Sequence, residues 1–457
     1  MDAPAPPRRA VFLASGLLMA GALLLSLAAF LRHPYAVNPT TVVACRAASW
    51  AGLGLGPALL LAGAWLWLRR ERADLWLAGT AGGRLLLGLV LLYAAGFVAL
   101  PAAEAGLRPW MKAGAPDLMI RYHPTRHHAM LANESRRVQG REYRFHLSTN
   151  SLGMRGPEPR APKGSPRILL LGNCFTEGVG VEAEETFCAR MQALLTPSCP
   201  QVEVVNGGCA SYSPLLEWRL LQETGPALRP DLVVLLLDCG NIADDFLYTE
   251  TASFAPDGDL LGVRGTEAAP GKKPVMSSIL STPQHSALCT GMMTLLRPAC
   301  AHAILSWGLR PPVTAQGDLH MDHQAVARVG MRDRLAGDLQ RSQGYLLRVR
   351  DLSRSLGAGF VLVTYPWGHQ VNEREWMPGR LDSGFLPGEA GDTWMMEEMR
   401  DFGAREGFPV ADLTEEFRRS GRFPLYYPRI GQWTPAGHAV AAEGIVRALR
   451  ASGLVPP

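Results

Sequence analysis

The sequence predicts an α/β domain built on a three-layer, doubly wound parallel sheet and preceded by three transmembrane helices. Three uncharged apolar runs of about 20 residues occupy the first quarter of the 457-residue chain, and runs of that length span bilayers. Beyond them, short apolar runs alternate with amphipathic stretches, a pattern typical of parallel strands joined by helices.

The three apolar runs cover Val11–Leu31, Ala47–Leu68 and Leu85–Ala103. Arginines precede the first run and separate the second from the third, which places both of these points in the cytoplasm. We therefore expect residues 1–103 to be a multi-pass anchor in the inner (cytoplasmic) membrane. The large C-terminal domain would then be extracytoplasmic, in the periplasm of a bacterium with an outer membrane.

Residues 104–165 are predicted to form a membrane-proximal stalk with short strands. Arg155 and Gly156 are expected to brace the domain rather than to bind a ligand. The group His123, His127 and His128 lies in a proline-containing loop without carboxylates at helical spacing. Solvated histidines are therefore a better interpretation of this group than a metal site.

The main domain is predicted to begin at residue 166 and to extend to 457. Ile168–Leu171 is apolar and is followed by Gly172, a polar turn and the amphipathic Ala183–Leu195. This order indicates a strand, a tight turn and a helix. A residue in such a turn lies where helix N–H groups favour a developing anion. Further strands are expected within 202–213, 230–245, 359–366 and 409–413.

Residues 246–356 are predicted to be an insertion that lies over the carboxyl edge of the sheet, where doubly wound folds place their ligands. Its first part is rich in Gly, Pro and Ser, and helical periodicity begins at Gln324. A cap or a surface for docking partner proteins is expected there. His320, Asp322 and His323 are interpreted as a polar loop rather than as metal ligands.

The segment Arg167–Val181 (RILLLGNCFTEGVGV) resembles block I of the SGNH (GDSL) hydrolases, whose loop reads Gly-Asp-Ser. Asn173 occupies the aspartate position and Cys174 the position of the serine nucleophile. The resemblance implies an ester-bond hydrolase or acyltransferase fold of the flavodoxin-like type.

Two later segments resemble blocks II and III of the same family. Within 202–213, Gly207 or Gly208 is expected to supply a backbone N–H to the oxyanion hole. Within 230–245, Asn241 is expected to donate its side-chain N–H. The resemblance thus implies a ligand cradle made of Asn173, Gly207, Gly208 and Asn241, together with the N–H of Cys174.

The segment 430–438 (IGQWTPAGH) resembles block V, which ends in the catalytic Asp and His. Gln432 falls at the histidine position, and Ile430 (or Arg429, if the spacing is one residue longer) falls at the aspartate position. A glutamine amide does not titrate near neutral pH and cannot act as a general base. Loss of a complete triad costs on the order of 10⁶ in turnover. The sequence therefore predicts that hydrolysis has been abandoned.

Two functions remain open. The first is a pseudoenzyme that binds or scaffolds in envelope glycan or lipid metabolism, with an acylated glycan or lipid as ligand and envelope proteins as partners. The second is an active esterase or O-acyltransferase with Cys174 as nucleophile and His369 or His438 as a recruited base. Neither requires a cofactor or a metal. A net charge of +4, spread thinly, argues against a nucleic-acid partner.

Seven cysteines lie beyond the predicted spans, so at least one thiol would be free. Cys188, Cys209 and Cys239 occupy positions typical of buried packing cysteines. Cys174, Cys209 and Cys239 come from three blocks that converge on one pocket. A disulfide among these three would seal the pocket, and the sequence leaves both interpretations open.

The predicted topology can be tested with a reporter. Alkaline phosphatase fused after Pro457 should be active, because the arginine distribution places residues 110–457 outside the cytoplasm. A silent fusion that is expressed at a normal level would indicate the inverse orientation.

Overall fold

The computed structural model describes residues 118–140, 142–164, 166–265, 320, 322–385 and 388–457, with positions 17, 57, 61, 64, 65, 68 and 69. The chain divides into two compact units, Met1–Lys112 with Lys272–Pro311, and Ala113–Gly271 with Pro312–Pro457. The second unit is described below. The three predicted spans lie almost wholly outside the described residues. No helix within the described part has both the length and the apolar character needed to cross a bilayer.

A five-stranded parallel sheet forms the centre of the second unit, in the order β11-β10-β7-β5-β6. Its strands are rich in Val, Ile and Leu, and every residue of β5 and β7 is buried, as expected for a sheet covered on both faces. The predicted parallel α/β sheet is therefore confirmed. The strands are β5 (Arg167–Leu171), β6 (Glu203–Asn206), β7 (Leu232–Leu237), β10 (Gly359–Thr364) and β11 (Val410–Asp412).

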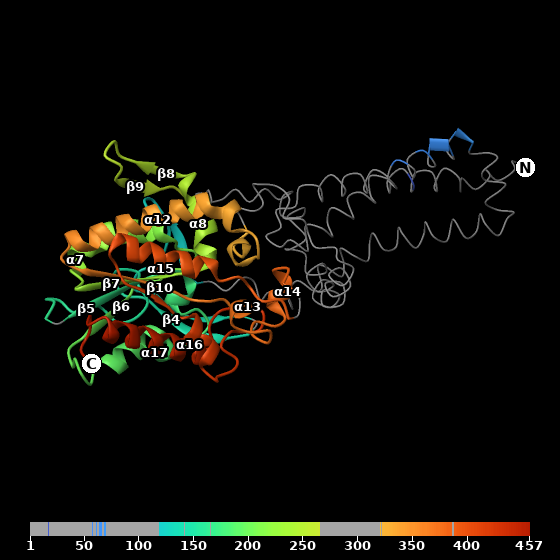
Figure 1. Ribbon diagram of the computed structural model, residues 1–457. Helices are drawn as coiled ribbons and strands as arrows, with labels where there is room; N and C mark the ends of the chain where they lie inside the picture. The colour runs from blue at the N-terminus through green and yellow to red at the C-terminus, as the bar shows by residue number, and fades with distance from the viewer. Residues whose placement is uncertain are drawn as a thin grey trace, which may run out of the picture. The chain divides into compact units, whose positions relative to one another are not determined.

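Helices cover both faces of the sheet and complete three layers (Figure 1). One face packs against α7 (Pro214–Leu228), α8 (Cys239–Thr249), α12 (Arg332–Ser355) and α15 (Trp394–Glu406). The other face packs against α6 (Phe187–Leu195), α16 (Thr414–Arg419) and α17 (Pro435–Ala451). Alternate strand residues enter the two apolar cores, because successive side chains of a strand point to opposite faces.

Local signals in the sequence set where several of these helices begin. The Thr186 hydroxyl accepts the Ala189 N–H at the start of α6, and the Asp238 carboxylate caps α8. Thr434 caps α17, which has proline at its first position. The remaining short helices are α5 (Cys174–Glu177), α13 (Gly368–Val371) and α14 (Gly379–Asp382), with 3₁₀ turns at Ala183–Glu185 and Ala325–Ala327.

The predicted insertion is shorter than 246–356. Its first residues belong to α8, which continues to Thr249, and its last part is α12, which packs on α7, α8 and β10. α12 is thus a helix of the sandwich and not part of a cap. The sequence correctly predicted a helix here. An amphipathic helix has the same pattern of apolar residues whether it packs on a sheet or forms part of a cap. Between α8 and α12 the described residues contain the hairpin of β8 (Ala252–Phe254) and β9 (Leu260–Val263).

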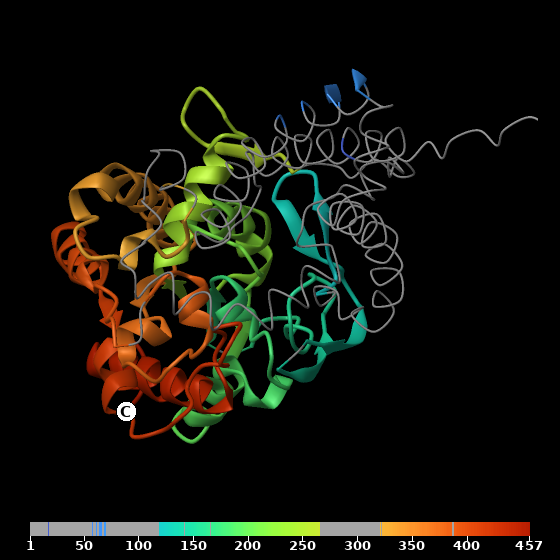
Figure 2. The ribbon, with the colours of Figure 1, turned by 90° about the vertical axis from the view of Figure 1, so that its right-hand side faces the viewer.

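Four short strands precede β5. β1 (Ile120–His123) pairs with β2 (His127–Met130), and β3 (Ser135–Gln139) pairs with β4 (Arg144–Ser148), both antiparallel. These hairpins, cyan and teal in Figure 2, lie beside the sandwich. Arg155 forms a bridge with Asn206 at the end of β6, which ties this segment to the sheet.

His128 is buried, in contrast to the predicted solvated loop. It lies in β2, where its Nε2–H donates to the Ala210 carbonyl at 2.8 Å and its Nδ1 faces that of His127 at 2.9 Å. Burial lowers the pKa of His128 to about 4, so this side chain is neutral at physiological pH. Neither the charge nor the spacing of this stretch indicates that the hairpin would bury His128.

Arg155 is almost wholly buried and donates to three carbonyl groups that follow the turn at Cys174. Nη1 reaches the Glu177 and Gly178 oxygens at 3.1 and 2.5 Å, and Nη2 reaches the Val181 oxygen at 2.7 Å. Its planar guanidinium presents donors in a fixed geometry that matches these acceptors, which the ammonium group of a lysine does not reproduce. Arg155 therefore braces the loop after Cys174 from the segment that precedes the sheet.

We expect Arg155→Ala to lower the free energy of unfolding by about 3 kcal/mol, because three carbonyl groups lose a charged donor. Arg155→Lys should recover only part of this loss. Thermal unfolding of the detergent-solubilised full chain measures the effect. Arg144→Ala, which removes an exposed arginine from β4, is the control and should change stability by no more than about 0.5 kcal/mol. Equal effects of the two alanine variants would contradict the bracing role.

Candidate active site

Cys174 lies at the turn between β5 and α5, as the sequence predicted. Gly172 permits this turn, because a Cβ there would lie 2.1 Å from the Thr176 hydroxyl. Asn173 caps the helix, and its Oδ1 accepts the Phe175 N–H at 3.0 Å. Gly178, with φ of 84°, ends the helix in the left-handed conformation.

The sulfur of Cys174 faces the side chain of Gln432, which comes from the loop before α17. Gln432 Nε2 donates to Cys174 Sγ at 3.2 Å, and this is the only hydrogen bond of the sulfur within the described ranges. The structure thus brings together the residues at the nucleophile and histidine positions. A neutral amide occupies the place where a triad requires an imidazole.

The environment of Cys174 disfavours a thiolate. Burial raises the pKa of the Cys174 thiol to about 12, and the nearby Asp238 carboxylate contributes to the increase. The hydrogen bond from Gln432 acts in the opposite direction but does not compensate. Since the thiolate is the reactive form of cysteine, Cys174 is a protonated and weakly reactive thiol at neutral pH.

Ile430 supplies no charge to this arrangement. Its backbone N–H donates to Glu142 Oε2 at 3.0 Å, and the Arg429 N–H donates to both oxygens of the same carboxylate at 3.0 Å. Glu142, from the turn between β3 and β4, therefore holds this loop through the backbone N–H groups of Arg429 and Ile430.

The expected oxyanion cradle is not open. The Gly207 N–H donates to the Leu170 carbonyl at 2.8 Å, and the Gly208 N–H donates to Asn206 Oδ1 at 3.0 Å. Asn241 Nδ2 donates to the Tyr212 carbonyl at 2.8 Å. The N–H groups of Gly207 and Gly208 and one of the two hydrogens of Asn241 Nδ2 are therefore engaged within the protein.

The surroundings of Gly208 and Asn241 hold these two donors in place. A Cβ at Gly208 would lie 2.3 Å from the Glu177 nitrogen, so the backbone is pressed against α5. Asn241 is fully buried, and its Oδ1 accepts the Asp238 N–H at 2.8 Å in a capping box of α8. Of the predicted cradle, the Cys174 N–H alone has no acceptor among the residues that the structure describes.

Asn173 ties three strands together rather than lining a cradle. Its Nδ2 donates to Asp238 Oδ2 at 2.9 Å, and the Tyr365 hydroxyl donates to both Asn173 Oδ1, at 3.1 Å, and Asp238 Oδ2, at 2.6 Å. Asp238 follows β7 and Tyr365 follows β10. The sequence analysis missed both, although each directly follows a buried apolar run, where parallel strands bring side chains to one edge.

Neither histidine proposed as a recruited base contacts the thiol. His369 Nε2 is held by Gln324 Oε1 at 2.7 Å, and burial lowers the pKa of His369 well below its usual value. His438 Nδ1 accepts the Phe187 N–H at 3.2 Å, and burial lowers the pKa of His438 to about 3.

Two further histidines pair with carboxylates. His320 contacts Asp338, and His323 Nε2 lies 3.0 Å from Asp244 Oδ1. No group of three or more His, Cys, Asp and Glu side chains could hold a metal ion in the part of the chain that is described.

Of the two interpretations that the sequence left open, the disulfide among Cys174, Cys209 and Cys239 is not formed. Cys174, Cys209 and Cys239 are free thiols, as are Cys188 and Cys199. Cys188, Cys209 and Cys239 are buried, as the packing interpretation expected, and burial raises the pKa of each. Cys239 Sγ lies 3.6 Å from Gln324 Oε1.

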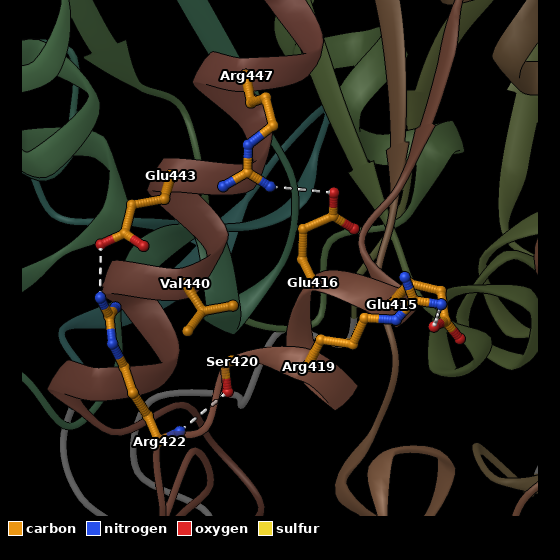
Figure 3. A pocket seen from close by; sticks show the side chains of 8 residues that line it. All are labelled: Glu415, Glu416, Arg419, Ser420, Arg422, Val440, Glu443 and Arg447. Atoms are coloured by element: carbon orange, nitrogen blue, oxygen red, sulfur yellow. Dashed lines mark hydrogen bonds and ion pairs between the residues drawn. The ribbon is translucent and has the colours of Figure 1, made fainter.

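A depression lies between α16 and α17, and its lining includes neither Cys174 nor Gln432 (Figure 3). It has a volume of about 360 Å³. Its acidic and basic side chains neutralise one another, as in the pairs Arg422–Glu443 at 3.0 Å and Arg447–Glu416 at 3.5 Å. It is lined by Glu415, Glu416, Arg419, Ser420, Arg422, Val440, Glu443 and Arg447.

Comparison with known proteins finds no matching family model and no matching curated protein. Among solved structures, an acetyl xylan esterase has 12% sequence identity and a TM-score of 0.33, covering 62% of this chain and 99% of its own. An alpha/beta hydrolase enzyme from the metagenome of Lake Arreo, Spain, has 16% identity and a TM-score of 0.31, covering 62% and 94%. A protein assigned to the G-D-S-L family, from Desulfitobacterium hafniense DCB-2, has 11% identity and a TM-score of 0.32, covering 62% and 99%.

The parallel sheet and its two helical layers agree with the three-layer α/β fold that the resemblance to the SGNH (GDSL) hydrolases implies, and membership of that superfamily stays a prediction. In this chain, the segments that resemble blocks I, II and III contain the parallel strands β5, β6 and β7, and the segment that resembles block V meets the first of them at Cys174 and Gln432. Identities of 11–16% carry no statement about activity or substrate.

We expect the Cys174 thiol to react unusually slowly with iodoacetamide. With a pKa of about 12, roughly one thiol in 10⁴ is ionised at pH 8, so the rate should still rise at pH 10. Peptide mass spectrometry of the alkylated full chain, in detergent, measures this rate. The unfolded chain is the control and should level off near pH 9. A plateau below pH 9 in the folded chain would contradict the burial argument.

Proposed function

We propose that this chain is a membrane-anchored, extracytoplasmic SGNH hydrolase-like protein that does not hydrolyse esters. It acts as a binding or scaffold component in envelope glycan or lipid metabolism. The contact between Gln432 Nε2 and Cys174 Sγ carries the proposal. A base must take the proton of the nucleophile and return it to the leaving group, and an amide can do neither.

The surroundings of this contact support the same conclusion. Oxyanion donors accelerate acyl transfer by roughly 10²–10³ each when they are aimed at the developing charge. The N–H groups of Gly207 and Gly208 and the amide of Asn241 are instead directed at protein oxygens. An acyl carbonyl entering this site would find neither a general base nor the backbone N–H groups of Gly207 and Gly208.

The membrane and envelope parts of the proposal rest on the sequence. Three long apolar runs with arginines at the cytoplasmic ends support a multi-pass anchor with the C-terminal domain outside. A protein held at the membrane with a closed former active site is suited to holding a ligand or assembling partner proteins. An acylated glycan or lipid is the proposed ligand class, with other envelope proteins as partners.

An enzymatic alternative, with Cys174 as nucleophile, requires a second base. The contacts of His369 with Gln324 and of His438 with the Phe187 N–H leave neither imidazole beside the sulfur. The alternative therefore lacks its base among the described residues.

The purified full chain in detergent should not hydrolyse p-nitrophenyl acetate or an O-acetylated oligosaccharide above the rate in buffer. Cys174→Ala should give the same rate as the unchanged protein, because the thiol lacks a base and is protonated. Release of nitrophenolate and of acetate measures the two reactions. Hydrolysis that is present in the unchanged chain and lost in Cys174→Ala would refute the proposal.

A further inference from the structure

The turn between β3 and β4 reaches the loop that carries Gln432. Through the Glu142 carboxylate it accepts three hydrogen bonds of 3.0 Å from the backbone N–H groups of Arg429 and Ile430. Ile430 lies two residues before Gln432. The position of the amide beside Cys174 therefore depends on a carboxylate that comes from the segment before the sheet.

Tyr143, the next residue of this turn, packs on the other side of the site. Its ring lies 5.9 Å from that of Tyr427, and the Tyr427 hydroxyl donates to the Gly180 carbonyl at 2.8 Å. A Cβ at Gly180 would lie 2.9 Å from the Tyr427 ring and 3.5 Å from the Tyr143 ring. The two tyrosines thus close tightly over the loop that follows Cys174.

The Cys174 side chain and Tyr143 belong to the same apolar surface. Both are partly buried and pack against one small cluster, formed by Met119, Val138, Phe145, Leu147 and Val179. The β3–β4 hairpin contributes three members of this cluster. Cys174 also packs against the core beneath α6 and α17. Movement of the turn would therefore expose the side of the thiol that faces the small cluster, whereas the main cores of the sheet would remain in place.

We propose that Glu142 and Tyr143 form a strap that restricts access to the partly exposed Cys174–Gln432 site, and that release of the strap opens the thiol further to the ligand of the proposed function, on which this inference rests. The strap is fastened by three hydrogen bonds to backbone N–H groups and by aromatic packing, at a half-buried edge of the domain. Such an attachment opens at a lower cost than the fold as a whole. Along the chain, Glu142 and Tyr143 lie between the predicted membrane spans and the sheet.

The strap can be tested by the rate at which iodoacetamide alkylates Cys174 at fixed pH in the full chain, in detergent. Glu142→Ala removes the acceptor of three hydrogen bonds and should accelerate alkylation at least about tenfold. Alkylation of the buried Cys188 and Cys239 in the same sample should not change, because strap release is local. Peptide mass spectrometry reads all three thiols together.

Glu158→Ala is the matched control. Glu158 also accepts a backbone N–H before β5, that of Ser151 at 2.9 Å, but does not reach the 429–432 loop. It should leave the alkylation of Cys174 unchanged. Tyr143→Ala and the milder Glu142→Gln give two independent openings of the strap if Glu142→Ala does not fold. A folded strap variant that leaves the Cys174 rate unchanged, or that accelerates all three thiols equally, would overturn the proposal.

Discussion

The Asp238 carboxylate, buried at the carboxyl edge of the sheet, is the group on which the arrangement around Cys174 depends. It receives the Asn173 amide, the Tyr365 hydroxyl and the N–H groups that begin α8, and it thereby joins the ends of β5, β7 and β10. A buried carboxylate is tolerated only when its oxygens are satisfied by donors. An aspartate at position 173 would place a second negative charge beside the first, so an amide at this position is what Asp238 requires.

The same carboxylate explains the pairing of Cys174 with Gln432. A negative charge near the sulfur, added to burial, disfavours the thiolate and raises the pKa of Cys174 to about 12. A neutral thiol needs no cationic partner, and the neutral amide of Gln432 meets it at 3.2 Å without burying a charge. The features that stabilise this hydrogen bond are therefore the same features that disfavour the thiolate form of Cys174.

The sequence predicted those parts of the fold and the site that depend on pattern. Apolar runs located β5 and β7, and the resemblance of 430–438 to block V implied that Gln432 would lie beside Cys174. It did not predict the direction of single polar groups, because the amide of Asn241 could serve an oxyanion or the Tyr212 carbonyl with the same sequence. Asp238 was missed for a related reason: its role arises only when Asn173 and Tyr365, far apart in the chain, converge on it.

The segment before the sheet holds both halves of the Cys174–Gln432 contact. Arg155 fixes the carbonyl groups that follow Cys174, and Glu142 fixes the N–H groups that precede Gln432. The two charged groups act on backbone atoms, so they set where each side chain stands without entering the site themselves. A displacement of this segment would change the relative position of the sulfur and the amide, since each loop is fastened to it separately. The geometry of the site is therefore a property of the whole unit that begins at the hairpins and not of the parallel sheet alone.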